Sequence, residues 1–491
     1  MTAKIVDIRK SYVDGRFVTG QGAPLAVENP ATEEIVAEAE TLSLAQMEEA
    51  VLAARRAFDS GVWSGLSREE RVEKVLALGE YLSGRSDELG ATLTAEAGST
   101  QAMLGAQVGM PLSHIRQACE LYLRLPESEP SMRPYDELFL GGRVTASIMR
   151  YEPIGVVTAI GAYNFPIQTV LWKFVPALLT GSTVILRPSP LTPIATLMLG
   201  EAADAVGLPP GVLNVVVEGG IEGGELLTTH PAVDCVSFTG STTVGKAIMA
   251  QASQTVKRVI LELGGKSVQL YLPDAVDKAP MGCMGVFAAH AGQACVAPTR
   301  MLVPEERKAE VLEKAAGVAG MLKVGDPTDP SSMIGPLISA AQRERNERYV
   351  AAAVDAGAKV VAGGKRTEGL ERGYYYDPTV LDVPDNSNPA AQDEIFGPVI
   401  CVIGYRDVDH AVEIANDTVY GLAGQVYGND LNAAIGVAER IQAGAVSVNG
   451  GTGGAYASGG GYKQSGLGRE RGIEGFRSLQ QVKHLSVGNP T

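Results

Sequence analysis

The sequence predicts an α/β fold that is built around a parallel, doubly wound sheet. Between residues 156 and 262, five short apolar runs alternate with helical stretches, and we expect each run to be a buried strand: VVTAI (156–160), TVILR (183–187), LNVVV (213–217), DCVSF (234–238) and RVILE (258–262). Buried strands that are joined by helical crossovers form parallel sheets. Ligands bind beyond the carboxyl ends of such strands, so chemistry is expected in the residues that follow each run.

The length of the chain predicts more than one packed unit. A chain of 491 residues is too long for one ordinary core, and we expect two or three units. A second α/β region extends from about residue 263 to 465, with strand-like runs VQLYL, RMLV, VICVIGY and AVSVN and a helix that begins near Pro304.

The N-terminal part begins with a predicted hairpin around Asp14-Gly15, a pair that accepts the positive φ values of a tight turn. Two helices then start from capping boxes, Ser43 with Gln46 and Ser67 with Glu70.

Two further segments fit neither α/β unit. RVTASIMRYEP (143–153) and SLQQVKHLSVG (478–488) alternate in polarity and are predicted to be exposed strands. Exposed strands invite pairing with another subunit, so these segments favour an oligomer.

Composition and charge exclude several classes of protein. Hydrophobic residues make up 45% and charged residues 20%, which is typical of a globular protein. The net charge of -15 argues against nucleic-acid binding, because such proteins usually carry a basic face. The start of the chain lacks the apolar core of a signal peptide, and no apolar run is long enough to span a bilayer, so we expect a cytoplasmic protein.

The five cysteines are an odd number, are widely spaced and include no CxxC motif. This pattern argues against a disulfide framework and against a structural zinc site, and we expect no metal.

Three side chains are candidates for chemistry, and each has a plainer alternative. Cys295 follows small residues that leave an approach path to a nucleophilic thiol, but the segment alone favours a buried core cysteine. Glu262 closes the run RVILE and could be a general base, or a turn carboxylate that pairs with Lys266. Asn164 precedes Phe165-Pro166 and could donate to an oxyanion, or it could form an Asx-turn.

The segment FTGSTTVGK (238–246) lies between a predicted strand and a helix, where backbone N–H groups could hold a pyrophosphate. Gly240 and Gly245 have the spacing of a P-loop, but Lys246 is followed by Ala247 rather than Ser or Thr, and the segment is not GxGxxG. The glycines alone are therefore a weak signal of phosphate binding.

Taken together, these segments resemble the aldehyde dehydrogenase superfamily. The resemblance covers nearly the whole chain in order: YEPIGVV, YNFP, RPSPLTP, FTGSTTVGK, LELGGK, GQACVAPTR, EIFGPV, ANDTVYGLAG and GGYKQSGLGRE. It implies a Rossmann-like cofactor domain (residues 1–129 and 150–262), a second α/β catalytic domain (263–465) and a small β oligomerisation arm (130–149 and 470–491) of a dimer or tetramer.

The resemblance also implies a reaction. The thiolate of Cys295 adds to an aldehyde, and the amide of Asn164 and the backbone N–H of Cys295 hold the oxyanion. Hydride transfer to the cofactor leaves a thioester, which water activated by Glu262 hydrolyses to an acid. Lys173 and Glu470 match a proton path behind Glu262.

The implied cofactor is NAD, with NADP left open. The residues that match its binding site in the family are Tyr163, Arg187, Ser189, Pro190, Gly240, Ser241, Val244, Gly245, Glu394 and Phe396. The family commonly has Lys at the position of Arg187 and often Glu at that of Pro190. Loss of that carboxylate would remove a group that repels a 2′-phosphate, and Arg187 could pair with one. Gly459 stands where the family often has Phe, which could widen the substrate or cofactor surroundings.

Two other activities remain as alternatives. A CoA-acylating dehydrogenase would pass the thioester to a thiol, but members of that branch usually lack the base at the position of Glu262. A Cys/His hydrolase would combine Cys295 with a histidine, and His290 is five residues away in the sequence.

Overall fold

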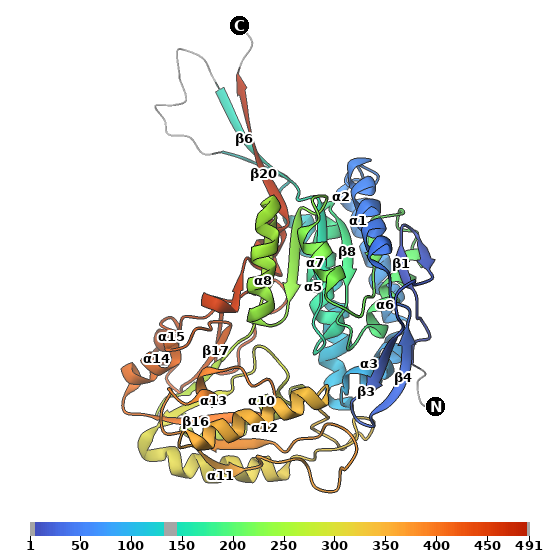
Figure 1. The fold of residues 1–491 in the computed structure, drawn as a ribbon. Helices are drawn as coiled ribbons and strands as arrows, with labels where there is room; N and C mark the ends of the chain where they lie inside the picture. The colour runs from blue at the N-terminus through green and yellow to red at the C-terminus, as the bar shows by residue number, and fades with distance from the viewer. Residues whose placement is uncertain (1–4, 132–144, 489–491) are drawn as a thin grey trace.

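The computed structural model describes residues 5–131 and 145–488 of the chain, and two large sheets dominate them (Figure 1). The first sheet has five parallel strands at its centre and antiparallel strands at both edges. Its strand order is β19 (Gly466–Leu467), β11 (Arg258–Glu262), β10 (Cys235–Thr239), β7 (Val156–Ile160), β8 (Thr183–Arg187), β9 (Leu213–Val215), β1 (Ser11–Val13) and β2 (Arg16–Val18). The predicted doubly wound sheet is therefore confirmed.

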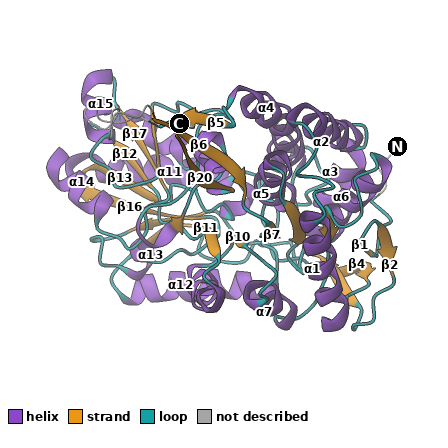
Figure 2. Ribbon diagram, turned by 90° about the horizontal axis from the view of Figure 1, so that it is seen from above, coloured by secondary structure: helices purple, strands orange, loops and turns teal. Residues whose placement is uncertain are grey.

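Helices cover both faces of this sheet. One layer contains α1 (Leu44–Asp59), α7 (Glu222–Thr229) and α8 (Thr242–Ala252), and the other contains α2 (Arg68–Ser83), α5 (Pro166–Thr180) and α6 (Ile194–Ala205). Seen from above, α1 and α7 lie on one side of β7 and α5 lies on the other (Figure 2). Both predicted capping boxes are present, at the N-termini of α1 and α2. The remaining helices of this half are α3 (Ser86–Ala97) and α4 (Met110–Arg124).

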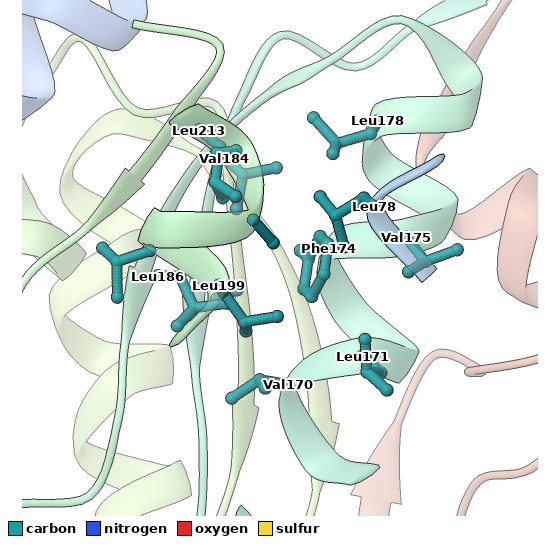
Figure 3. Close-up of a cluster of buried hydrophobic side chains, with 14 of the residues drawn as sticks. Leu78, Val170, Leu171, Phe174, Val175, Leu178, Val184, Leu186, Leu199 and Leu213 are labelled. Carbon is teal, nitrogen blue, oxygen red and sulfur yellow. The ribbon is translucent and has the colours of Figure 1, made fainter. Parts of the chain in front are cut away.

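The core explains why the strands are apolar throughout. Alternate residues of one strand face different helix layers: Val184 and Leu186 pack in the cluster of α5 and α6, whereas Ile185 packs in the cluster of α1. Figure 3 shows the first cluster, in which Phe174 and its neighbours on α5 face β8 and α6. A strand that is buried on both faces has no exposed polar positions, and this produces the continuous hydrophobic runs of the sequence.

The second sheet is parallel except at one edge. Its strand order is β14 (Lys359–Ala362), β15 (Thr379–Asp382), β16 (Val399–Tyr405), β13 (Arg300–Pro304), β12 (Val268–Tyr271), β17 (Ala423–Tyr427) and β18 (Ala445–Val448). The helices of this region are α9 (Ala279–Gly282), α10 (Met284–Phe287), α11 (Lys308–Met321), α12 (Ala340–Asp355), α13 (Pro389–Gln392), α14 (Val408–Asn416) and α15 (Leu431–Ala438). The last helix, α16 (Gly472–Ser478), packs instead against α4 and α5 of the first unit. All four predicted strands are present, but the helix expected near Pro304 begins only at Lys308, after a 3-10 turn.

The two predicted exposed strands lie side by side and project from the body of the molecule (Figure 1). β6 (Thr145–Pro153) pairs antiparallel with β20 (Gln480–Gly488) and, on its other edge, with β5 (Ser128–Pro130). Residues 132–144 and 489–491 of the predicted arm lie outside the described residues. A separate hairpin contains β3 (Leu25–Asn29) and β4 (Glu34–Ala39).

None of the helices in the described parts of the chain combines the length and hydropathy needed to cross a membrane.

Candidate active site

The three candidate side chains line a single cavity of about 560 Å³. Asn164 lies in the loop that follows β7, Glu262 is the last residue of β11, and Cys295 lies in the loop before β13. The carboxyl ends of the parallel strands β7 and β11 bring the first two together, and the second sheet supplies the thiol.

An unusual backbone presents Cys295 to the cavity. His290, Ala291 and Gly292 have φ values of 53°, 52° and 73°, so three successive residues adopt the left-handed region. A Cβ on Gly292 would lie 2.0 Å from the carbonyl oxygen of Gly397, so only glycine fits there. Cys295 is partly exposed, whereas the other four cysteines are buried. The alternative of a core cysteine is therefore wrong.

Asn164 is fixed by hydrogen bonds to distant residues. Its side-chain Nδ2 donates to the backbone carbonyl of Gln293 at 2.7 Å. The backbone carbonyl of Asn164 accepts from Gln107 Nε2 at 2.8 Å. Gln293 is held in turn, because its Oε1 accepts from the backbone N–H of Ile338 at 3.0 Å. The side-chain amide of Asn164 therefore bonds to a distant segment, and not within a local Asx-turn. Since an amide nitrogen carries two hydrogens, Asn164 has a second one for a ligand.

Glu262 is half-buried in the same cavity. Its Oε1 is buried and has no hydrogen-bond partner within the described residues. Burial and the negative charge of Glu470 raise the pKa of Glu262 to about 8. The buried amine of Lys266 makes no hydrogen bond to Glu262 in the part of the chain that is described, so the alternative of a Glu262–Lys266 pair is wrong.

A buried ion pair lies beside Glu262. Lys173 Nζ, on α5, contacts Glu470 Oε1, and Ser237 Oγ donates to the same oxygen at 3.3 Å. The side chains of Lys173 and Glu470 are 0% and 4% exposed. Both charges act on Glu262, which places the pair next to the candidate base.

The Cys295 thiol is protonated at neutral pH in the unliganded protein. Burial, together with the carboxylates of Glu394 and Glu262, raises the pKa of Cys295 to about 12. Formation of the attacking thiolate therefore requires a base, and Glu262 is close enough for its charge to act on the sulfur.

Glu394 and Phe396 also line the cavity. Glu394 Oε1 accepts from the backbone N–H of Gly265 at 2.9 Å. Two side chains of α12, which the sequence did not single out, hold this turn: Gln342 Nε2 donates to the carbonyl of Phe396 at 2.7 Å, and Arg345 donates to that of Glu394 at 2.7 Å. Phe396 needs this support because its φ is +64°.

The glycine-containing segment before α8 also reaches the cavity. Gly240 and Ser241 are among its lining residues, as is Tyr163, whose ring packs edge-on against Phe396 with centroids 5.9 Å apart. Ser241 caps α8 by accepting from the backbone N–H of Val244 at 3.3 Å. Gly245 permits close packing, since a Cβ there would lie 2.5 Å from Leu263.

Arg187, Ser189 and Pro190 lie at the carboxyl end of β8 and do not line the cavity. Arg187 is already paired: its Nη2 and Nε donate to Glu218 Oε2 at 2.8 and 3.0 Å, and Nη2 also donates to the carbonyl of Gly220 at 2.8 Å. Glu218 thus already pairs with the arginine that the sequence suggested could bind a 2′-phosphate.

Comparison with known proteins agrees with this arrangement over the whole chain. The sequence profile of the aldehyde dehydrogenase family matches residues 17–485. The chain belongs to the aldehyde dehydrogenase family. It is 39% identical to 3-succinoylsemialdehyde-pyridine dehydrogenase of a Pseudomonas species over 97% of this chain and 98% of that protein.

Two solved aldehyde dehydrogenases have the same fold. A cysteine-to-alanine mutant of aldehyde dehydrogenase C from Pseudomonas syringae, in complex with NAD+ and octanal, has a TM-score of 0.92 and 40% identity, with 99% of this chain and 98% of that chain covered. Betaine aldehyde dehydrogenase of Staphylococcus aureus, in complex with NAD+, has a TM-score of 0.93 and 35% identity, with 99% and 96% covered. The present aldehyde dehydrogenase is thus an NAD-dependent oxidoreductase that oxidises aldehydes to acids.

The two alternative activities are not favoured in this aldehyde dehydrogenase. His290 is buried, its ring packs against Phe165, and it makes no hydrogen bond to Cys295 within the described residues. Burial lowers the pKa of His290 to about 4, so it is a poor base. Glu262 lies in the catalytic cavity, and a base at this position favours hydrolysis of the thioester over transfer of the acyl group to CoA.

Proposed function

We propose that Cys295 is the nucleophile of this enzyme and that Glu262 is its general base. Glu262 takes the proton of the thiol, and the thiolate adds to the aldehyde carbon. The oxyanion accepts hydrogen bonds from Asn164 Nδ2 and the backbone N–H of Cys295. The observation that carries this proposal is the cavity that Asn164, Glu262 and Cys295 share and that Glu394 and Phe396 also line.

The residues of the cavity suit a dinucleotide. We assign the carboxylate of Glu394 to ribose hydroxyls, Phe396 and Tyr163 to the nicotinamide side, and the N-terminus of α8 at Gly240 and Ser241 to the pyrophosphate. A bound NAD+ would supply the hydride acceptor, and loss of a hydride would convert the carbon attached to Cys295 into a thioester.

Hydrolysis then completes the cycle. Glu262 removes a proton from water, the oxygen adds to the thioester carbon, and the sulfur of Cys295 leaves as thiolate while the acid is released. We propose that the Lys173–Glu470 pair carries the proton of Glu262 away, because both residues are buried directly beside it.

The roles of the two domains, the oligomeric state and the cellular location are also proposals. The first sheet would hold the cofactor and the second would carry the nucleophile, which follows the boundaries expected from the sequence. The outer edge of β20, with Val482 and Val487 more than half exposed, supports assembly into a dimer or tetramer. A cytoplasmic location is proposed on the sequence alone.

A panel of aldehydes assayed with NAD+ and with NADP+ tests the function. The wild type should reduce NAD+ with at least one aldehyde and release the corresponding acid in equal amount. Cys295→Ala should abolish the activity, whereas Cys119→Ala, a change at a buried cysteine of α4 outside the cavity, should retain it. Activity in Cys295→Ala equal to that of the wild type would refute the assigned nucleophile.

A further inference from the structure

Arg471 places a cation in the catalytic cavity. It follows Glu470 directly and lines the same cavity as Glu262 and Cys295. No ion pair or hydrogen bond of its guanidinium is found within the described residues, and its buried Nε has no partner there. Such a group is costly to bury unless a ligand satisfies it.

Neighbouring rings fix the position of this guanidinium. It lies over the ring of Trp172, 4.6 Å from the ring centroid. Trp172 is fixed in turn, because its Nε1 donates to His114 Nδ1 at 3.2 Å. The other side of Arg471 faces a small, mostly apolar pocket that is also lined by Ile115, Phe476 and His114. The catalytic cavity is the larger of the two spaces and has room for a ligand that accepts from Arg471.

Gly459 makes room for the guanidinium. A Cβ at this position would lie 2.9 Å from Arg471 Nη2, so a phenylalanine here would displace the arginine. Two backbone hydrogen bonds between Gly459 and Glu470, of 2.7 and 2.9 Å, hold the two segments together. The backbone of Arg471 is itself strained, with φ 58° and ψ 172°, a region that residues other than glycine avoid.

Arg471 has no direct carboxylate partner among the described residues, and the negative charges that act on it come from Glu470 and Glu262. The carboxylate of Glu470 is already paired with Lys173. Burial raises the pKa of Glu262 to about 8, so at pH 7 this group is mainly neutral. His114 is also mainly neutral at that pH, because burial lowers its pKa.

We propose that Arg471 binds a carboxylate at the far end of the substrate, so that the preferred substrates are aldehydes whose apolar chain ends in an acid group. A guanidinium pairs with a carboxylate through two parallel hydrogen bonds, and the cation–π contact with Trp172 orients its plane. Apolar residues such as Met103, Phe165 and Leu422 line the cavity. They suit the apolar carbon chain that joins the aldehyde and the carboxylate of the substrate. This inference rests on the proposed function.

The test compares two aldehydes of equal shape in the full-length enzyme. In 5-methylhexanal an isopropyl group replaces the carboxylate of 5-oxopentanoate, and chains of four to eight carbons extend the comparison. We expect the wild type to prefer the acidic aldehyde. Arg471→Met should lower kcat/KM for it by about 10- to 100-fold, mainly through KM, with less than about a threefold change for the neutral partner. Arg471→Lys should retain part of the preference.

Arg469→Met is the matched control. The positive charges of Arg469 and Arg471 both lower the pKa of Glu262. Arg469, however, does not line the cavity, and its guanidinium donates to the carbonyls of Gly461 and Gly468. The preference should survive in this variant. Equal preference in wild type and Arg471→Met, or an equal loss on both aldehydes, would overturn the proposal. Binding of glutarate, measured by calorimetry, gives a readout without turnover and should weaken in Arg471→Met alone. If no aldehyde reduced NAD+, the proposed function would fail instead.

Discussion

Glu262 is the residue whose protonation state controls two proposed steps, thiol activation and thioester hydrolysis. Its carboxylate sits at the end of β11 with one oxygen buried and unbonded within the described residues. Burial keeps the group basic, because the charged form is poorly solvated. The same burial protonates Cys295 at rest, so the pH dependence of the reaction should follow the glutamate rather than a free thiolate.

The pH profile tests this assignment. Burial and Glu470 raise the pKa of Glu262 to about 8, so the ionised, active form increases as pH rises through that value. We expect kcat to rise from pH 6 and to be half-maximal near pH 8 when hydrolysis is rate-limiting. Steady-state rates between pH 6 and 10 measure this directly. A rate that stays flat over this range would rule out the assigned pKa.

Arg187 and Glu218 give a prediction about the cofactor. Glu218 neutralises the arginine that would otherwise attract a 2′-phosphate. Glu218→Gln should therefore increase kcat/KM for NADP+ relative to NAD+ by about fivefold at low salt, which is the size of a near-surface charge effect of about 1 kcal/mol. Parallel assays with both cofactors measure the ratio. An unchanged ratio would show that this pair does not contact the ribose.

At the scale of elements, a buried carboxylate holds the start of α6. The two oxygens of Glu96, on α3, accept the backbone N–H groups of Ile194 and Ala195 at 2.8 and 2.9 Å. The first N–H groups of a helix have no partners within the helix, so this side chain connects two helices by satisfying them.

Removing this carboxylate should destabilise the first sheet and its helices. Glu96→Ala leaves two buried N–H groups without partners, at a cost of about 1–3 kcal/mol each, and should lower the Tm by several degrees. Glu96→Gln retains one acceptor and should lose less. Thermal unfolding of the two variants checks the order, and a Tm for Glu96→Ala equal to that of the wild type would contradict it.

The sequence predicted the central elements well because their patterns are local. The runs 156–160, 183–187 and 258–262 coincide with β7, β8 and β11. The strands β14, β15 and β17 were not predicted: β14 is mostly exposed, and β17 is a short strand in which Gly424 and the polar Gln425 interrupt the apolar pattern. Their pairing depends on neighbours far away in the chain.

The site residues also differ in how far the sequence predicts them. Asn164, Glu262 and Cys295 lie in motifs that are recognisable one at a time. Gln107 and Gln293, which orient Asn164, are 57 and 129 positions away from it in the sequence. No local sequence pattern predicts contacts over such separations. Arg471 was missed because its setting depends on Gly459 and Trp172, which join it only in the folded chain.

At the scale of the whole molecule, the projecting strands β6 and β20 form a sheet whose outer edge is β20. Leu485 and Val487 are 38% and 52% exposed there, and exposed apolar strands are stabilised by pairing with another chain. We expect an oligomer in solution.

Charged substitutions on this strand test the assembly. Leu485→Lys combined with Val487→Lys should shift the mass measured by light scattering toward the monomer. The site residues lie elsewhere, so the fold of the body should persist in circular dichroism. A mass equal to that of the wild type oligomer would exclude this surface as the interface.

The most direct test of the central claim is the intact mass of Glu262→Gln after incubation with NAD+ and a substrate aldehyde. If Cys295 and Glu262 act on one carbonyl, this variant should release one equivalent of NADH, stop, and gain the mass of one acyl group on Cys295. Turnover at the wild-type rate with no acyl group on the protein would contradict the claim.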